Sequence, residues 1–554
     1  MEIMDKALDM GKSSATGSLS LMVGVVASTV IMAAGTIILA MVLSDAELGL
    51  YGVAMIPSSM INFFRDWGVN SAMTQRIASL RAAKRESEIH DVIVAGVLFE
   101  VGSGVVLSLV CFGLADFLAF VLQRPAASTF ISIMSATILA GAVLAAANAI
   151  FFGYEKMMLN SLTSIFMAMI KTAVGPLLVI LGFNVFGAIL AASISAVAAG
   201  VLGIVVAYIM LFKPLHAQKE GKTDIKNALK PLLGYGIPLT ISNVVIGVTP
   251  QIFAFVMALY APDEIMGNYW SSNFFLVLLT FFSVPISNAL FPTFSKLNPK
   301  EEPKLLQTVF ASSIKYTSIL IVPTTLLVIS LATPMVQTLF ADKYPHAPLF
   351  LSLSAIISLL AVVGNISLGI FQTAVKETRQ VMKQSLLSLG VGLPIGLLLA
   401  VSTGMSGDPT LAVVGGIIGI LIAHLPGTIW GLIWVWQHYH VRADFSSSAK
   451  ILGASLLAAG LTFGFLTFFL PFMSGYIPFL LAVTSRPWMM LVLGFALFLI
   501  VYLTTSPLIG AINQAEINNF RHMFSGIPVV SKIVEIVLRL EERVLKLRRT
   551  STTP

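Results

Sequence analysis

Four charged residues lie inside otherwise apolar stretches of the chain, where an ionised side chain needs a partner, a ligand or water. Arg65 and Asp66 are adjacent, Glu100 lies in the next apolar stretch, and Lys171 lies in a later one. A charge at the bilayer centre costs roughly 2.5–3.5 kcal/mol, so such residues usually face a cavity or each other. The four charges sum to zero and could form the charged wall of a hydrated central cavity.

A simpler interpretation of these four residues stays open: they could form two salt bridges that only hold helices together. Polar residues in the stretch that contains Arg65 recur every fourth position, namely Ser58, Asn62, Asp66 and Asn70. This spacing predicts one polar face on a continuous helix. Neighbouring residues do not face each other on a helix, so Arg65 needs a partner on another element.

The second half of the chain offers amides rather than charges. Asn243 and Gln251 share one predicted helix face, and Asn273 follows close to Tyr269 and Trp270. Amides beside aromatic rings suit a sugar ligand, and they equally suit hydrogen bonds between helices. The predicted substrate-binding residues are Arg65, Lys171, Asn62, Asn243, Gln251 and Asn273, and the predicted ion-coupling or charge-balancing residues are Asp66 and Glu100.

The elements that must position these residues are membrane-spanning helices. Hydrophobic residues make up 57% of the 554 residues and charged residues only 11%, against about 25% in a typical soluble domain. A span needs ~20 apolar residues. We predict an all-α polytopic membrane protein with about fourteen spans, at 19–43, 49–73, 91–115, 128–152, 158–181, 185–212, 232–259, 265–291, 308–331, 348–373, 384–402, 410–436, 450–471 and 488–510.

The basic residues fix the expected orientation. With a cytoplasmic N-terminus, the outer loops hold only three of the 33 Lys and Arg residues, namely Arg124, Lys343 and Arg486. Cytoplasmic loops are normally rich in Lys and Arg. We therefore expect a multi-pass plasma-membrane protein with both termini in the cytoplasm. The net charge of +7 is then explained by topology, and a nucleic-acid partner is not expected.

One motif occurs twice. Asp-x-x-x-Gly-x-Tyr covers 45–51 and recurs 218 residues later at 263–269. Six predicted helices separate the copies, so both have the same orientation. We predict two six-helix lobes related by a pseudo-two-fold axis along the membrane normal. The same offset places Arg65 and Asp66 on Ser283 and Val284, so the charge belongs to the first lobe.

The predicted domains are therefore an N-lobe at 1–230, a C-lobe at 231–440, an extra helix pair at 441–510 and a cytoplasmic amphipathic tail at 511–554. In the tail, a helix between 527 and 549 has an apolar face that includes Ile533, Ile536, Val537 and Leu540. This face could lie on the membrane surface, where Lys and Arg meet anionic lipid. It could equally pack on the protein's own loops.

Enzymatic and metal chemistry have no support in the sequence. The chain has no Walker loop and no His/Glu metal spacing, and its one cysteine, Cys111, lies in an apolar run. We predict that the protein is not an enzyme and has no metal or other cofactor, apart from coupling to Na⁺ or H⁺.

Two stretches resemble a known family of transporters. Gly49-Leu50-Tyr51-Gly52 and Asp66-Trp67-Gly68 are similar to the second helix of polysaccharide-export flippases, in the multidrug/oligosaccharidyl-lipid/polysaccharide (MOP) superfamily. The stretch 267–297 is similar to the family's eighth helix, because it ends with a Pro-x-Phe-Ser element at 292–295 before a basic loop. The resemblance covers about residues 15–510.

The resemblance implies a function and partners. It implies that a polyprenyl-(di)phosphate-linked oligosaccharide or polysaccharide repeat unit moves from the cytoplasmic to the outer leaflet by alternating access. Arg65 matches a place where related flippases put a cavity arginine that meets a lipid phosphate, whereas the second lobe has no matching arginine. The resemblance therefore implies that Arg65 and Lys171 meet phosphate, and that Asp66 or Glu100 balances them or binds the coupling cation. Fourteen spans resemble the lipid II flippase branch, whose extra pair forms a groove for the lipid tail.

The partners that the resemblance implies are the glycolipid, membrane lipids and glycan-assembly enzymes, with the protein a monomer. The alternative function is a cation-coupled drug or metabolite exporter of the same superfamily.

Overall fold

The computed structural model describes residues 24–217, 224–279, 290, 294, 295, 297, 301–442, 444–514, 516–518, 521 and 535–545. Its regular elements are all helices, as predicted, and no strand occurs in these residues. Ser283 and Val284, part of the 292–296 element and much of the predicted tail helix lie outside them. The chain forms two compact units, one of residues 1–274 and 378–427 and the other of residues 275–377 and 428–554. The predicted domain boundaries stay a prediction.

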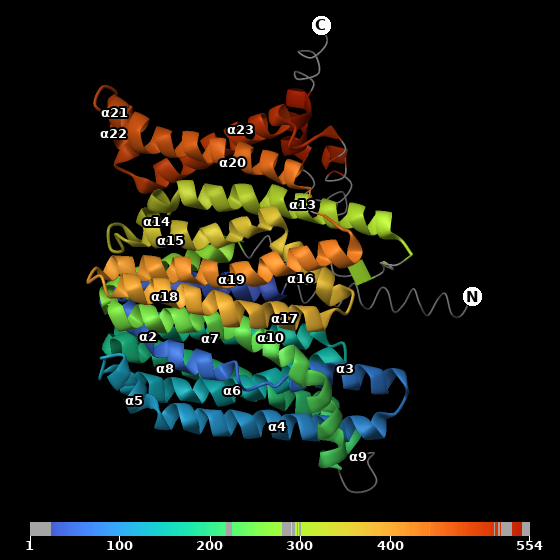
Figure 1. Cartoon of the computed structure of the whole chain (residues 1–554). Coiled ribbons are helices and arrows are strands. Elements are labelled where there is room, and N and C mark those ends of the chain that lie inside the picture. Colours follow the sequence, from blue (N-terminus) through green and yellow to red (C-terminus); the bar gives the residue numbers. More distant parts are fainter. Residues whose placement is uncertain are drawn as a thin grey trace. The chain divides into compact units, whose positions relative to one another are not determined.

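The first unit contains Arg65, Asp66, Glu100 and Lys171. Figure 1 labels helices α2 to α10 of this unit. The unit begins with a helix at Gly24–Val42. The helices that follow are α2 (Asp45–Asn62), α3 (Val69–Ala82), α4 (Glu86–Gly113), α5 (Ala115–Val121), α6 (Ala127–Gly153), α7 (Met157–Leu178), α8 (Asn184–Ala207), α9 (Lys213–Ala217), α10 (Ile225–Tyr260), α11 (Asp263–Asn273), α17 (Thr378–Leu387), α18 (Leu393–Gly404) and the first part of α19 (Pro409–Tyr439).

The second unit is built on α13, which packs against α20 and α23. Ile319 and Val322 of α13 meet Ala454 of α20 and Phe498 of α23 in one apolar core. The helices of this unit are α13 (Pro303–Ser330), α14 (Ala332–Phe340), α15 (Ala347–Ile356), α16 (Asn365–Ala374), the end of α19, α20 (Phe445–Gly464), α21 (Leu470–Ser474), α22 (Pro478–Thr484) and α23 (Pro487–Ile509).

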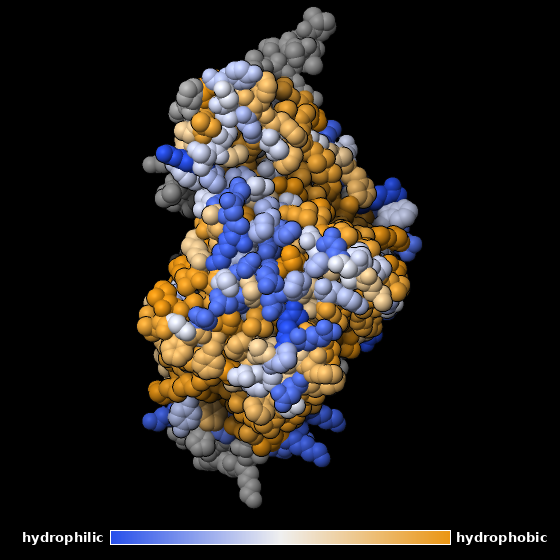
Figure 2. Space-filling model, turned by 90° about the vertical axis from the view of Figure 1, so that its left-hand side faces the viewer, coloured by the Kyte–Doolittle hydropathy of each residue, from blue (hydrophilic) through white to orange (hydrophobic). Residues whose placement is uncertain are grey.

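Ten helices of the described chain are long and apolar enough to cross a membrane, or eleven if one bent pair counts as a span. The bent pair is 347–363 with 365–374, which turns by 57° around Gly364. Two predicted spans are merged in the long helical stretch Met157–Leu215, which is kinked where Gly182 and Asn184 have positive φ. Figure 2 views the molecule from the side that lies on the left in Figure 1, and hydrophilic residues are gathered on this face.

The predicted continuous helix at 49–73 is wrong. Helix α2 ends at Asn62 and α3 starts at Val69, and Trp67 and Gly68 between them have left-handed φ values of 42° and 73°. A Cβ at Gly68 would overlap the backbone of Gly236 in α10, so this close approach also requires glycine. The predicted polar face is therefore split between two helices and a turn.

The two copies of the repeated motif pack against each other inside the first unit. Helices α2 and α11 begin at the two copies and are in close contact. A Cβ at Gly49 would overlap the carbonyl of Asp263, and a Cβ at Gly267 would overlap the carbonyl of Asp45. This reciprocal contact is what a local two-fold relation between the copies produces. The motif needs its glycines because two backbones touch there.

The tail helix packs on the second unit, which also contains a largely buried ion pair. In the described part of the tail, Leu538 and Leu545 are buried in the core that α13, α20 and α23 form. Ile536 and Leu540 of the predicted apolar face are exposed, so the helix packs on the protein through a different face. Lys315 of α13 forms a 2.7 Å ion pair with Glu516.

Candidate functional site

Arg65 and Glu100 form a buried ion pair at the break between α2 and α3. Arg65 Nη1 donates to Glu100 Oε2 at 2.9 Å, and Arg65 Nε donates to Asn62 Oδ1 at 3.2 Å. Arg65 is 8% exposed and Glu100 is fully buried. Because the break takes Arg65 out of the helix, its side chain can reach the middle of α4. One of the two salt bridges considered from the sequence is therefore present.

Asp66 adds a second carboxylate beside this pair. Its Oδ1 accepts a hydrogen bond from the backbone N–H of Asn70 at 3.0 Å, in the first turn of α3. The side chains of Asp66 and Asn70 both lie within interaction range of Glu100. Within the described chain, Glu100 Oε1 and Asn70 Oδ1 are buried and make no hydrogen bond of normal distance and angle, while the side chains of Asp66 and Asn70 lie close to the Glu100 carboxyl group. Unsatisfied buried acceptors are rare and call for an explanation, such as a proton, an ion or a water.

Close backbone contacts from α10 and α6 hold this cluster in place. Helix α10 lies against the turn at Gly68 through Gly236, and Gly141 of α6 brings its backbone close to the Asn62 side chain. The α2–α3 turn itself is closed by hydrogen bonds from the N–H of Arg65 to the carbonyl of Asn62 and from the N–H of Val69 to that of Asp66. The arrangement can bind either an anion through Arg65 or a cation through the two carboxylates.

Lys171 lies apart from this cluster. It lines a small recess between the first helix, α2 and α7, where Tyr51 and Pro176 are its neighbours. Tyr51 and Asn62 are separated on α2 by ~16 Å along the helix axis. The structure therefore brings Arg65, Asp66, Glu100 and Asn62 together and places Lys171 elsewhere.

The predicted amide residues are spread along α10 and α11. Asn243 is exposed on α10, whereas Gln251 and Asn273 are half-buried. Asn273 lies beside Tyr269, the tyrosine of the second motif copy, and interacts with its hydroxyl. The roles of these three amides in substrate binding stay predictions.

Arg124, predicted only as a charge in an outer loop, makes several contacts that the sequence does not predict. Arg124 forms an ion pair with Asp263 at 2.5 Å and donates to the carbonyls of Ala258 and Ala261 at 2.5 and 2.6 Å. It therefore ties the loop after α5 to the turn between α10 and α11. The signal in the sequence was an isolated arginine in an outer loop, a place where basic residues are rare.

The comparisons with known proteins agree with this fold. The model of the polysaccharide biosynthesis protein family matches residues 14–298. A search of the curated proteins gives no match. Among solved structures, the chain is similar to the lipid II flippase MurJ in an inward closed conformation, with a TM-score of 0.65, 15% identity, and coverage of 88% of this chain and 97% of that one.

Two further similar structures are transporters. One is an inward-facing multidrug resistance MATE family transporter of the MOP superfamily, with a TM-score of 0.60, 15% identity, and coverage of 74% and 95%. The other is a MOP superfamily transporter from Pyrococcus furiosus, with a TM-score of 0.53, 16% identity, and coverage of 79% and 96%. These neighbours are transporters and a flippase rather than enzymes, as expected for this chain. The protein is a multi-pass membrane protein that belongs to the polysaccharide biosynthesis protein family and has the fold of MOP superfamily transporters.

Proposed function

We propose that the protein is a flippase that carries a polyprenyl-(di)phosphate-linked glycan from the cytoplasmic to the outer leaflet of the plasma membrane. The observation that carries this proposal is the buried Arg65–Glu100 pair with Asp66 beside it, in a family named for polysaccharide biosynthesis. A buried arginine that already has a carboxylate partner can exchange it for a phosphate, which offers the same paired acceptor geometry.

The exchange requires that Glu100 does not remain as an unpaired buried charge. A proton or Na⁺ that binds between Glu100 and Asp66 would neutralise that charge and release Arg65 to the phosphate. The acceptor Glu100 Oε1, which makes no hydrogen bond of normal distance and angle with the described residues, is where such a cation would bind. Release of the cation would restore the ion pair and expel the anion. In this scheme the cation and the glycolipid are bound together and cross in the same direction, so a cation gradient that falls from the cytoplasm to the outside would drive the movement of the glycolipid.

The test is a flipping assay in proteoliposomes with a fluorescent polyprenyl-diphosphate-linked oligosaccharide. Wild-type protein should move the lipid faster when an imposed H⁺ or Na⁺ gradient has the same direction as the lipid movement than without a gradient. Glu100→Gln should remove this dependence on the gradient. Wild-type protein that moves no glycolipid but exports a cationic dye would refute the proposal and favour the drug or metabolite exporter, which the similarity to the multidrug transporter makes the second candidate.

A further inference from the structure

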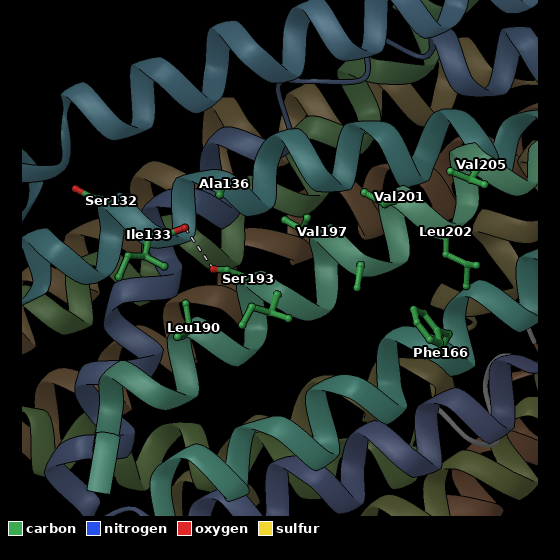
Figure 3. Close-up of a pocket in the computed structure, with 12 residues that line it drawn as sticks. Ser132, Ile133, Ala136, Phe166, Leu190, Ser193, Val197, Val201, Leu202 and Val205 are labelled. Atoms are coloured by element: carbon green, nitrogen blue, oxygen red, sulfur yellow. Dashed lines mark hydrogen bonds between the residues drawn. The ribbon is translucent and has the colours of Figure 1, made fainter. Parts of the chain in front are cut away.

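Two hollows of the first unit differ in their chemistry. The larger has a volume of about 770 Å³, lies between α6, α7 and α8, and is lined by two serines and otherwise apolar residues (Figure 3). Its Ser193 hydroxyl already donates to the carbonyl of Ile133. This lining needs no polar ligand, and membrane lipid can cover it. The smaller hollow is the recess that Lys171 lines, and its polar groups do need a ligand.

The recess lies between four helices of the first unit, namely the first helix, α2, α7 and α8. Leu39, Tyr51 and Pro176 are buried residues of its walls. Its volume is about 10 Å³, which is enough for one species of about the size of a water molecule. A tetrahedral phosphate group is too large for this space. The recess can therefore hold a water or a small ion.

Two side chains present hydrogen-bond donors to the recess. Tyr51 is 6% exposed, and its buried hydroxyl has no hydrogen-bond partner among the described residues. Lys171 is half-buried and forms neither an ion pair nor a hydrogen bond with them. A hydroxyl and an ammonium group that line the same small space can both donate to one acceptor. The ligand that suits them is therefore an acceptor.

No other side chain of the recess balances the charge of Lys171. None of the described residues that line the recess is acidic. The hydroxyls of Thr36 and Thr172, which also line it, already donate to backbone carbonyls of the first helix. Because a charge in an apolar environment is unfavourable without a partner of opposite charge, an anion is favoured over a water.

The second copy of the repeated motif shows how such a tyrosine is normally satisfied. Tyr51 and Tyr269 end the two copies and are buried to a similar extent, at 6% and 7% exposed. The Tyr269 hydroxyl interacts with the side chain of Asn273. The 218-residue offset places Met55 at the corresponding position of the first copy. Methionine cannot replace the amide as a partner, so the hydroxyl of Tyr51 is left for a ligand in the recess.

We propose that the recess binds one small monovalent anion of halide size, which accepts a hydrogen bond from the Tyr51 hydroxyl and neutralises the Lys171 ammonium group. Tyr51 lies ~9 Å along the helix axis from Asp45, at the end of α2 that is predicted to be outer. The site uses no residue of the Arg65–Glu100 cluster. It therefore goes beyond the proposed function and does not depend on it.

The experiment is equilibrium binding of radioactive chloride to the purified full chain in detergent, at constant ionic strength with gluconate as the other anion. Wild-type protein should show a single saturable site from which bromide displaces the chloride. Lys171→Met should abolish binding, and Tyr51→Phe should weaken it about tenfold, because a hydrogen bond to a charged group is lost.

Matched controls separate this site from other binding. Tyr154→Phe removes another buried tyrosine hydroxyl without a hydrogen-bond partner in the described chain, and Lys213→Met removes an exposed lysine. Both variants should bind chloride as wild type does. The thermal unfolding temperature of wild type should rise when chloride replaces gluconate, whereas that of Lys171→Met should not change.

Several results would overturn the inference. One is wild-type protein that binds no chloride, since a water would then satisfy Tyr51 and Lys171. Another is equal binding by wild type, Lys171→Met and Tyr51→Phe, which would place the chloride elsewhere. Displacement of chloride by inorganic phosphate as effectively as by bromide would assign the recess to a phosphate instead. Flipping of a glycolipid by the protein, or its absence, leaves each of these outcomes unchanged.

Discussion

Replacing Arg65 alone should destabilise the protein far more than replacing Arg65 and Glu100 together. The pair spans 2.9 Å, and its side chains are 9% and 0% exposed. Arg65→Met leaves a buried carboxylate with no cation, which typically costs ~3–5 kcal/mol. The double variant Arg65→Met/Glu100→Leu removes both charges and should be near neutral, since hydrophobic replacements of buried pairs are often neutral or stabilising by ~1–4 kcal/mol.

The assay is the free energy of unfolding of wild type, both single variants and the double variant in detergent micelles with rising SDS. The double-mutant cycle should give a coupling energy of several kcal/mol, at or above the upper end of the ~0.5–3 kcal/mol usual for contacting residues. A matched control is the exposed pair Arg85–Glu88, with 58% and 40% exposed side chains, whose coupling should be ~0.2–1 kcal/mol. Additive effects at Arg65 and Glu100 would refute the buried ion pair.

Three further predictions concern other parts of the chain. Gly49→Val should destabilise the protein or change its conformation, because the valine side chain would overlap the backbone of Asp263. Gly102→Val is the control, since open space surrounds Gly102, and it should have neither effect. The thermal unfolding temperatures of the two variants measure the difference. Arg124→Lys should weaken the link to the α10–α11 turn, because three different guanidinium nitrogens donate to Asp263, Ala258 and Ala261 and the single ammonium nitrogen of lysine cannot occupy all three positions. Hydrogen exchange at that turn should therefore rise. Burial raises the pKa of Glu541 from 4.5 to about 7, so docking of the tail helix should be strongest below pH 4.5 and should weaken as the pH rises through 7. Limited proteolysis at pH 5 and pH 8 measures this, and Glu541→Gln should remove the difference.

The all-helical class and most spans could be predicted, because the length of each apolar stretch and the number of Lys and Arg residues in each loop can be read directly from the sequence. The repeat was also informative, since the contact between Gly49 and Gly267 gives the matched glycines a physical cause. Each glycine lies where α2 and α11 contact each other. The repeated sequence pattern shows that these glycines matter, but it does not show which helix each of them contacts.

The break between α2 and α3 could not be predicted from the helical spacing alone. Residues 63–68 include three aromatic side chains, which are typical of a span, and the turn depends on the close approach of α10 at Gly236. The pairing of Arg65 with Glu100, and of Arg124 with Asp263, depends on packing between helices that are distant in the chain. By residue type Lys171 and Arg65 looked equivalent, and only the structure separates the two.

Transbilayer movement of a polyprenyl-diphosphate-linked oligosaccharide in proteoliposomes that contain wild-type or Arg65→Ala protein measures whether flipping requires Arg65. The control is Arg85→Ala, which changes an exposed arginine. We expect gradient-dependent flipping by wild type and Arg85→Ala, and none by Arg65→Ala protein that remains folded by size-exclusion chromatography. Flipping by Arg65→Ala at the wild-type rate would contradict this expectation.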